Sequence, residues 1–419
     1  MSGAPPDASA TAPPGTGGPP SLWRNRAFNL LWSGQCLSDL GAAMADLALP
    51  LLVLQETGSP ARAGLIGTVG LAATMLCRLP AGVLADRFDR RRLLIACDVL
   101  RIVAYALLAW AVAMDAAALP VILAVVVGSA AATAVFSTTE HAAIRSLVHP
   151  GQIPAAVARN EARSYGTSLA GPPLGGLLFG IGGALPFLGN ALSFLLSLVA
   201  VVSIRRPLQE PRPAPADPAA PAGGSVTEGV RFVLGHPFLR WLLVIAAPLN
   251  MAFTGMIFAM TLALRRAGVS PFLVGLAGTV FALGGFLGAF AAPALQRWLR
   301  LPDLITLLCW LTAGLMTVAT LLSTSVLAAV PMAAAVFLGP AANAALFGHQ
   351  AAITPDRLQG RVISVLLLAA GSAAALAPAL AGALLARWAP GTAMLVFPAL
   401  VICAALAATF VRGSRVMSA

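Results

Sequence analysis

The 419-residue chain is 59% hydrophobic and only 10% charged, so it cannot cover a water-facing surface of its own size, which would need about a quarter of its residues charged. Its net charge of +11 rests on 26 basic residues, all arginine, but they lie between long apolar runs without an interleaved aromatic stripe, which excludes nucleic acid as a partner. The runs are too long and too uniformly apolar for barrel strands, so we expect an all-α membrane protein whose solvent is the lipid bilayer.

Twelve runs reach about the 20 residues that a helix needs to cross a bilayer. A tail over residues 1–22 precedes them; it is rich in Pro, Gly, Ser and Ala, has no basic residue, and is expected to be a disordered cytoplasmic tail. Membrane helices are expected over residues 27–55, 62–84, 93–114, 119–139, 160–180, 184–204, 238–264, 271–295, 303–323, 326–348, 361–386 and 391–411.

The first run carries two acids, Asp39 and Asp46, whose seven-residue spacing places them on one face of a helix. Gln35 lies near the same face. Ionisable groups at bilayer depth are costly and indicate function, so we predict a polar stripe that lines a central cavity. Asp46 is expected to be the main proton-carrying group and Asp39 the second. A structural hydrogen bond to a neighbouring helix is the alternative for each acid.

The loop after the second run carries the most specific motif. It reads Gly82-Val-Leu-Ala-Asp86-Arg87-Phe-Asp89-Arg90-Arg91-Arg92. This resembles the signature loop of the major facilitator superfamily, Gly-x-Leu-Ala-Asp-Arg-x-Gly-Arg-Arg, with Asp89 where the family usually has glycine. The resemblance implies a conformational switch: Gly82 permits a close helix approach, Asp86 faces the start of the helix near Arg361, and the arginines hold cytoplasmic helix ends together. A purely topogenic basic loop is the alternative.

A second motif lies in the fifth run and reads Gly171-Pro172-Pro-Leu-Gly175-Gly176. It is similar to the Gly-Pro-x-x-Gly-Gly signature of the superfamily's antiporters and therefore implies export. Pro172 frees a backbone carbonyl and the glycines permit a tight, bendable helix contact; plain helix packing is the alternative. A weak internal repeat lays Pro172 on Pro378 and suggests two related halves.

A Pro/Ala-rich gap over residues 205–237 divides the runs six and six, and a short surface helix is expected within it at 225–234. We therefore expect an N-terminal bundle at 23–204, a cytoplasmic linker at 205–237, a C-terminal bundle at 238–412 and a cytoplasmic tail at 413–419. Twenty of the arginines, Arg163 among them, fall on the side of both termini and four on the other, which predicts cytoplasmic termini.

The second half offers apolar cavity candidates and almost no charge, with Asn250 as a polar exception. The apolar candidates are Met256, Phe258, Met260, Phe281, Phe286 and Phe290. Such a lining suits a lipophilic substrate better than a sugar or a phosphate. No nucleotide-binding loop, metal-ligand cluster or nucleophile constellation is present, so we expect no cofactor, no metal and no enzymatic activity, and an ion gradient as the energy source.

Other stretches, such as Gly34-Gln-x-x-Ser38, resemble the bacterial branch of the superfamily that includes siderophore (enterobactin) exporters and macrolide-efflux proteins. The expected function is a monomeric secondary exporter in the bacterial cytoplasmic (inner) membrane, which exchanges protons for a drug, antibiotic or siderophore by alternating access and confers multidrug resistance. Nutrient uptake by the same fold is one alternative, and a non-transporting membrane scaffold is another.

Overall fold

The computed structural model describes residues 22–209, 226–355 and 358–413, and all regular secondary structure within them is helical. The predictions for the N-terminal tail, for residues 210–225 of the linker and for residues 414–419 lie outside this part of the chain. The first half contains α1 (Arg26–Thr57), α2 (Pro60–Arg87), α3 (Arg90–Ala113), α4 (Leu119–Leu147), α5 (Ile153–Ile181) and α6 (Leu185–Ser203). The second half contains α7 (Val226–Gly235), α8 (Pro237–Arg266), α9 (Pro271–Trp298), α10 (Leu301–Leu321), α11 (Ala329–Val336), α12 (Gly339–Ile353), α13 (Gln359–Arg387), α14 (Pro390–Met394) and α15 (Val396–Gly413), with short 3-10 turns at Leu22–Arg24, Pro150–Gln152 and Val326–Ala328.

The helix ends follow local chemistry. Helix α1 ends at Gly58, which adopts the left-handed conformation at φ 62°, and Ser59 then caps α2 by accepting a hydrogen bond from the Arg62 amide at 3.4 Å. Asp89 caps α3 in the same way and accepts from the Arg92 amide at 2.9 Å. The aspartate that replaces the usual glycine of the signature loop therefore begins a helix.

Four of the predicted runs differ in the structure, and one of them, 391–411, is broken at Leu395 between α14 and α15. Helix α5 begins at Ile153 rather than near residue 160, and α4 continues to Leu147 rather than ending near 139. Within these added turns Arg159 donates to Asn29 of α1 and Glu140 pairs with Arg163 of α5. The run predicted over 326–348 is broken between α11 and α12, where Pro340 stands in the first turn of the new helix. The short helix predicted over 225–234 is confirmed as α7.

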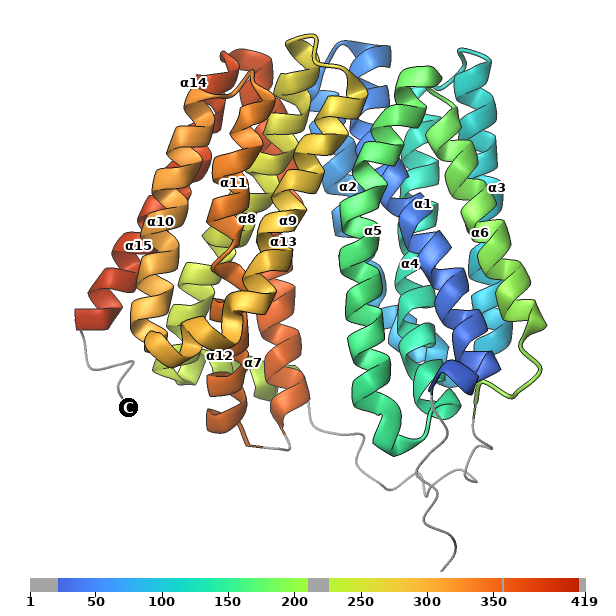
Figure 1. The fold of residues 1–419 in the computed structure, drawn as a ribbon, viewed down its shortest axis with the longest axis horizontal. Coiled ribbons are helices and arrows are strands. Elements are labelled where there is room, and N and C mark those ends of the chain that lie inside the picture. The colour runs from blue at the N-terminus through green and yellow to red at the C-terminus, as the bar shows by residue number, and fades with distance from the viewer. Residues whose placement is uncertain (1–21, 210–225, 356–357, 414–419) are drawn as a thin grey trace, which may run out of the picture.

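The helices form two groups that meet at one end of the molecule (Figure 1). In the first group α1 packs on α5 and α6, and α4 packs on α2 and α3; in the second, α8 packs on α13 and α15, and α9 on α11 and α12. Helix α2 contacts α13 and α5 contacts α9 across the two groups. We define the closed end as the end with the α1–α2 turn, where the groups meet, and the open end as the end with α7 and the start of α1, where they lie apart.

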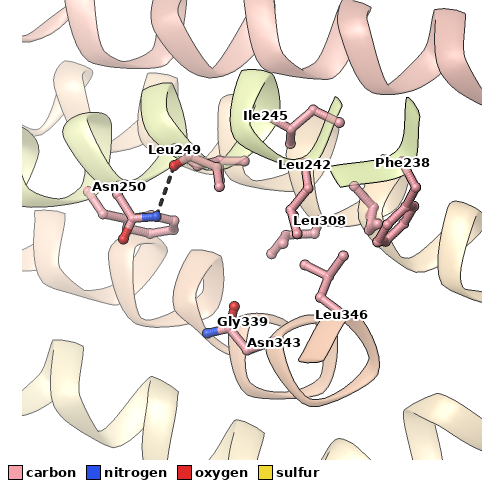
Figure 2. Close-up of a pocket in the computed structure, with 12 residues that line it drawn as sticks. Phe238, Leu242, Ile245, Leu249, Asn250, Leu308, Gly339, Asn343 and Leu346 are labelled. Carbon is pink, nitrogen blue, oxygen red and sulfur yellow. Dashed lines mark hydrogen bonds between the residues drawn. The ribbon is translucent and has the colours of Figure 1, made fainter. Parts of the chain in front are cut away.

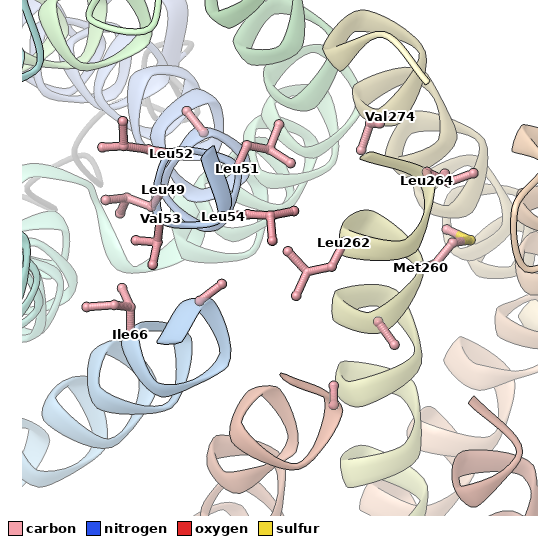
Figure 3. Packing of buried hydrophobic residues seen from close by; sticks show 14 of the residues in the cluster. Leu49, Leu51, Leu52, Val53, Leu54, Ile66, Met260, Leu262, Leu264 and Val274 are labelled. Carbon is pink, nitrogen blue, oxygen red and sulfur yellow. The ribbon is translucent and has the colours of Figure 1, made fainter. Parts of the chain in front are cut away.

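A buried apolar cluster joins both groups near the closed end. Leu51, Leu52 and Leu54 of α1 belong to the same cluster as Met260 and Leu262 of α8, and Figure 3 shows these side chains on facing helices. The outer surface is also apolar: Leu76, Phe290 and Trp298 are 76%, 74% and 83% exposed. An apolar exterior of this kind is suited to lipid.

Eleven spans among the described residues are long and apolar enough to cross a membrane. Helix α5, with 29 residues, has the length but is absent from this set. Its first half carries Arg159, Glu161 and Arg163, which lower its hydropathy. Two of these charged residues, Arg159 and Arg163, contact side chains of neighbouring helices.

Candidate functional site

The central cavity lies between the two groups of helices and has a volume of about 680 Å³. This is within the range of about 300–1,000 Å³ that is typical of drug-sized ligands. Its lining comes from both halves and is mostly apolar. The larger apolar side chains are Leu47, Ile66, Leu71, Val126, Phe194, Ile257, Phe258, Met260, Leu264, Val274 and Phe281.

Asp46 is the one acid among the described residues that line this cavity, and that lining contains no Arg or His. The residue is exposed although it lies deep within α1, because the cavity opens beside it. No hydrogen bond or ion pair joins it to another described residue. The first half also adds uncharged polar groups to this lining, namely Thr74, Tyr105, Ser129, Thr133 and Ser168. Asp46 is therefore an ionisable group open to cargo and to solvent.

Asp39 has a different environment, since it forms an ion pair. Its Oδ2 lies 2.9 Å from Arg163 Nε, and Arg163 Nη1 donates to Glu140 Oε1 at 2.8 Å. The side chains of Arg163 and Glu140 are 9% and 4% exposed, whereas that of Asp39 is 37% exposed. One guanidinium thus joins α1, α4 and α5 through two carboxylates, in the open-end part of the first half.

Glu140 and Arg163 were missed in the sequence. Arg163 was counted only as a topogenic charge near the cytoplasmic start of its helix, whereas the structure pairs it with Asp39 and Glu140 inside the first half. Glu140 fell just beyond the predicted end of its helix. One feature of the sequence could have indicated this pair. An acid and a base lie close to the facing ends of two consecutive apolar runs, so they could meet when the two helices pack together.

Gln35 does not line the central cavity. Helix α6 covers this part of α1, and a Cβ on Gly34 would lie only 2.9 Å from Ala200 Cβ. Gln35 is buried there and its Nε2 donates to Ser197 Oγ at 3.1 Å, which in turn donates to Asp98 Oδ2 at 2.9 Å. The predicted polar stripe therefore divides into three environments: Asp46 faces the cavity, Asp39 forms an ion pair with Arg163, and the amide of Gln35 belongs to a buried network.

That buried network contains the ion pair of Asp98 and Arg101. The Arg101 guanidinium carbon lies 4.3 Å and 4.2 Å from the ring centroids of Phe136 and Phe194. Both charged side chains are almost completely buried. Their contacts with α4 and α6 indicate a structural role.

Asn250 lines a separate, smaller cavity of about 140 Å³ inside the second half (Figure 2). Its Nδ2 donates to the Ala246 carbonyl at 2.9 Å, one turn earlier in α8. Asn343 of α12 and Leu308 of α10 lie across this pocket. Of the apolar candidates, Phe258, Met260 and Phe281 line the central cavity, whereas Met256 is packed in the core and Phe290 is on the exposed surface.

The signature loop lies at the open end, and the close helix approach expected at Gly82 is absent from this conformation. A Cβ there would meet nothing within 4 Å, because the two groups of helices lie apart at this end. Arg361, at the start of α13, is paired with Glu228 of α7 at 2.7 Å.

The arginines of the loop instead hold the first half together. Arg90 donates to the carbonyls of Ala142 at 3.0 Å and Leu208 at 3.3 Å, and Arg91 donates to that of Val202. Arg87 is exposed, and the switch role of Asp86 stays a prediction.

The glycine-proline motif of α5 packs on two helices at once. Gly171 and Gly175 lie against Ala43 and Met44 of α1; a Cβ on Gly175 would be 2.6 Å from the Met44 carbonyl oxygen. Gly176 and Pro172 instead touch α9 in the other half, at Pro271 and Gly275. The motif therefore fixes α5 between its own bundle and the opposite one.

Two helical halves around a central cavity define the architecture of a membrane transporter. Residues 31–348 match the model of the Major Facilitator Superfamily, and the chain belongs to this family of transporters. The multidrug efflux pump Tap of Mycobacterium tuberculosis (strain ATCC 25618 / H37Rv) is 28% identical over 375 residues, which cover 86% of this chain and 87% of the relative. Tap of Mycolicibacterium fortuitum is 28% identical over 362 residues, with 82% and 85% covered.

Solved structures agree in fold. A bacterial homologue of the human lysosomal transporter Spinster, inward-facing and unoccupied, superposes with a TM-score of 0.73 at 18% identity, covering 93% of this chain and 97% of the other. A bacterial homologue of the iron transporter ferroportin, also inward-facing, has a TM-score of 0.73 at 17% identity and covers 93% and 99%.

Proposed function

We propose that the chain is a secondary active exporter of lipophilic small molecules, of the multidrug type, in a bacterial cytoplasmic membrane. The observation that carries the proposal is the apolar central cavity with a single acid in its described lining. Similarity to the efflux pump Tap along most of both chains supports export rather than uptake. The partners in this proposal are the cargo, protons and the lipid bilayer, and the chain acts as a monomer.

The open end is proposed to face the cytoplasm. Arginines concentrate there: those of the signature loop, Arg159, and the pair Arg205 and Arg206 all lie at this end. The two superposable solved structures described as inward-facing support the same assignment. Both termini then lie in the cytoplasm.

Protons are the proposed counter-ion and Asp46 the proposed carrier. An exporter of this type takes up a proton from outside and releases it inside, and a carboxylate in contact with the cavity can do so when cargo and proton use it in turn. Asp46 meets this requirement because no described cation neutralises it. Asp39 is second, since Arg163 already compensates its charge.

The test is uphill transport in proteoliposomes with an imposed pH gradient. Asp46→Asn keeps the shape and removes titration, so it should abolish gradient-driven export while downhill exchange of cargo persists. Asp39→Asn should be milder, because Arg163 keeps Glu140 as its partner. Asp115→Asn, in the turn after α3 at φ 52°, is the matched control, since asparagine tolerates that conformation. Full uphill export by the Asp39→Asn/Asp46→Asn double variant would refute the assignment, and cargo accumulation in the opposite direction would indicate uptake.

A further inference from the structure

The closed end consists of two helix crossings between the halves, α2 with α13 and α5 with α9. At each crossing glycines bring backbones into contact. A Cβ on Gly64 or Gly382 would overlap the carbonyl of Pro378 or Pro60, and a Cβ on Gly176 or Gly275 would overlap that of Pro271 or Pro172. Main chain meets main chain there, so neither crossing can loosen by side-chain adjustment alone.

The two crossings are built from the same short sequence. Helix α2 contains Gly64-Leu-Ile-Gly67-Thr68-Val69, and α9 contains Gly275-Leu-Ala-Gly278-Thr279-Val280. Each follows a proline in the first turn of its helix, Pro60 or Pro271, by the same four residues. The partner helices, α5 and α13, are each interrupted by proline. The closed end thus has a twofold pattern in sequence and in contacts.

A threonine of each repeat bonds to the proline-interrupted helix of the other half. Pro173 has no N–H, so the Leu169 carbonyl loses its usual helical donor, and Thr279 Oγ1 donates to that carbonyl at 2.7 Å. At the other crossing, the Ala379 amide directly after Pro378 donates to Thr68 Oγ1 at 2.9 Å. In both cases a backbone group beside a helix break is satisfied from across the interface.

We propose that Thr68 and Thr279 are a pair of gate residues whose hydroxyls set how readily the closed end opens. Separation of the halves breaks both bonds and leaves a backbone carbonyl and a backbone amide without these partners, which is costly away from water. The closed state is therefore favoured until water or a polar group of the cargo reaches these groups. Gly67, Gly278, Pro172 and Pro378 line the central cavity, so cargo at its end touches both crossings.

This inference does not depend on the identity of the cargo or of the coupling ion. A buried hydrogen bond contributes about 0.5–1.5 kcal/mol, which corresponds to about a two- to tenfold change in the open-to-closed ratio for each bond. Thr→Val removes the hydroxyl with little change of shape, and Thr→Ser retains it. Thr74 provides the matched control: it lies on α2, lines the cavity and bonds only within its own helix, to the Gly70 carbonyl at 2.9 Å.

The experiment measures distances between spin labels in lipid nanodiscs without cargo or gradient. With the native cysteines replaced, one label pair at positions 62 and 387 reports on α2 and α13, and a pair at 181 and 267 reports on the end of α5 and the turn that leads into α9. Thr68→Val and Thr279→Val should each raise the population with the closed end separated by about two- to tenfold, and the double variant should raise it further. Thr68→Ser, Thr279→Ser and Thr74→Val should match the parent.

Unchanged distances in the double valine variant would overturn the proposal, as would serine variants that open as much as the valine variants. Because no transport is measured, failure of the export assignment would leave this result unaffected, and failure of this result would leave the export assignment standing.

Discussion

The aspartates of α1 and α3 are chemically identical but have three different environments. Asp46 faces the cavity, Asp39 shares a guanidinium with Glu140, and Asp98 is completely buried against Arg101. A buried pair of this kind adds little net stability over an apolar pair of similar volume, but removal of one partner leaves an uncompensated charge. The three acids therefore predict different consequences for the same substitution.

Asp98→Asn should destabilise the protein by about 3–5 kcal/mol, because Arg101 then stays buried between Phe136 and Phe194 without a counter-charge. The measurement is thermal unfolding in detergent. Asp98→Asn/Arg101→Met should recover much of the loss, since it removes both charges. If the double variant were no more stable than Asp98→Asn, the loss of stability could not be attributed to the unpaired charge of Arg101.

At the scale of helices, α5 packs against its own half and against the opposite one. Its Gly171 and Gly175 face α1, whereas its Pro172 and Gly176 face α9. One turn after this motif, Gly180 has open space around it, since a Cβ there would meet nothing within 4 Å. One helix therefore offers a crowded glycine and an open one five residues apart.

Gly175→Ala should lower thermal stability by about 1–3 kcal/mol, because the added methyl group meets the main chain of Met44, which cannot move like a side chain. Gly180→Ala should leave stability unchanged or raise it slightly through helix propensity. The comparison of the two melting temperatures in detergent checks this. Equal melting temperatures would mean that α1 and α5 separate freely at this crossing.

The helix boundaries explain which site residues the sequence could predict. Apolar runs predicted the position of each membrane helix, and Asp39 and Asp46 stood out within one of them. Glu140 lies just beyond the end that hydropathy gives to its helix, and Arg163 lies near the start of the predicted fifth helix, where an arginine is most simply explained as a topogenic charge. The break between α11 and α12 was missed for the opposite reason, since an apolar sequence runs through it without interruption.

At the scale of the whole molecule, the distribution of the arginines predicts the topology. A reporter fused after Ala419 and one inserted within residues 214–222 should both report the cytoplasm, because these positions follow α15 and α6, which end at the open end. A reporter in the short turn at residues 267–270 should report the opposite side. Fluorescent and alkaline phosphatase fusions distinguish the two. A periplasmic signal from either of the first two would require an odd number of crossings.

The fold of the whole molecule could be predicted from the sequence, but the contacts between the two halves, α2 with α13 and α5 with α9, could not. The signature loop and the glycine-proline motif pointed to the family, and Pro172 and Pro378 do occupy matching places in the two halves. The repeat that contains Thr68 and Thr279 could not be recognised in the sequence, because Gly-Leu-x-Gly-Thr-Val is short. Its role becomes visible only in the structure, where each threonine forms a hydrogen bond next to a proline of the other half.

Within the described residues, every buried charged side chain belongs to the first half: Asp98, Arg101 and Glu140. In the proposed exporter, the ionisable groups near the cavity therefore belong to the first half, whereas apolar side chains of both halves line the cavity. Adaptation to a new compound can proceed through Phe258, Met260 or Phe281 without disturbing an ionisable network. Selection of the proposed exporter with a series of unrelated toxic compounds should therefore accumulate changes among the apolar lining residues and leave the ionisable network of the first half nearly constant, so that one proposed proton-coupling site serves many cargoes.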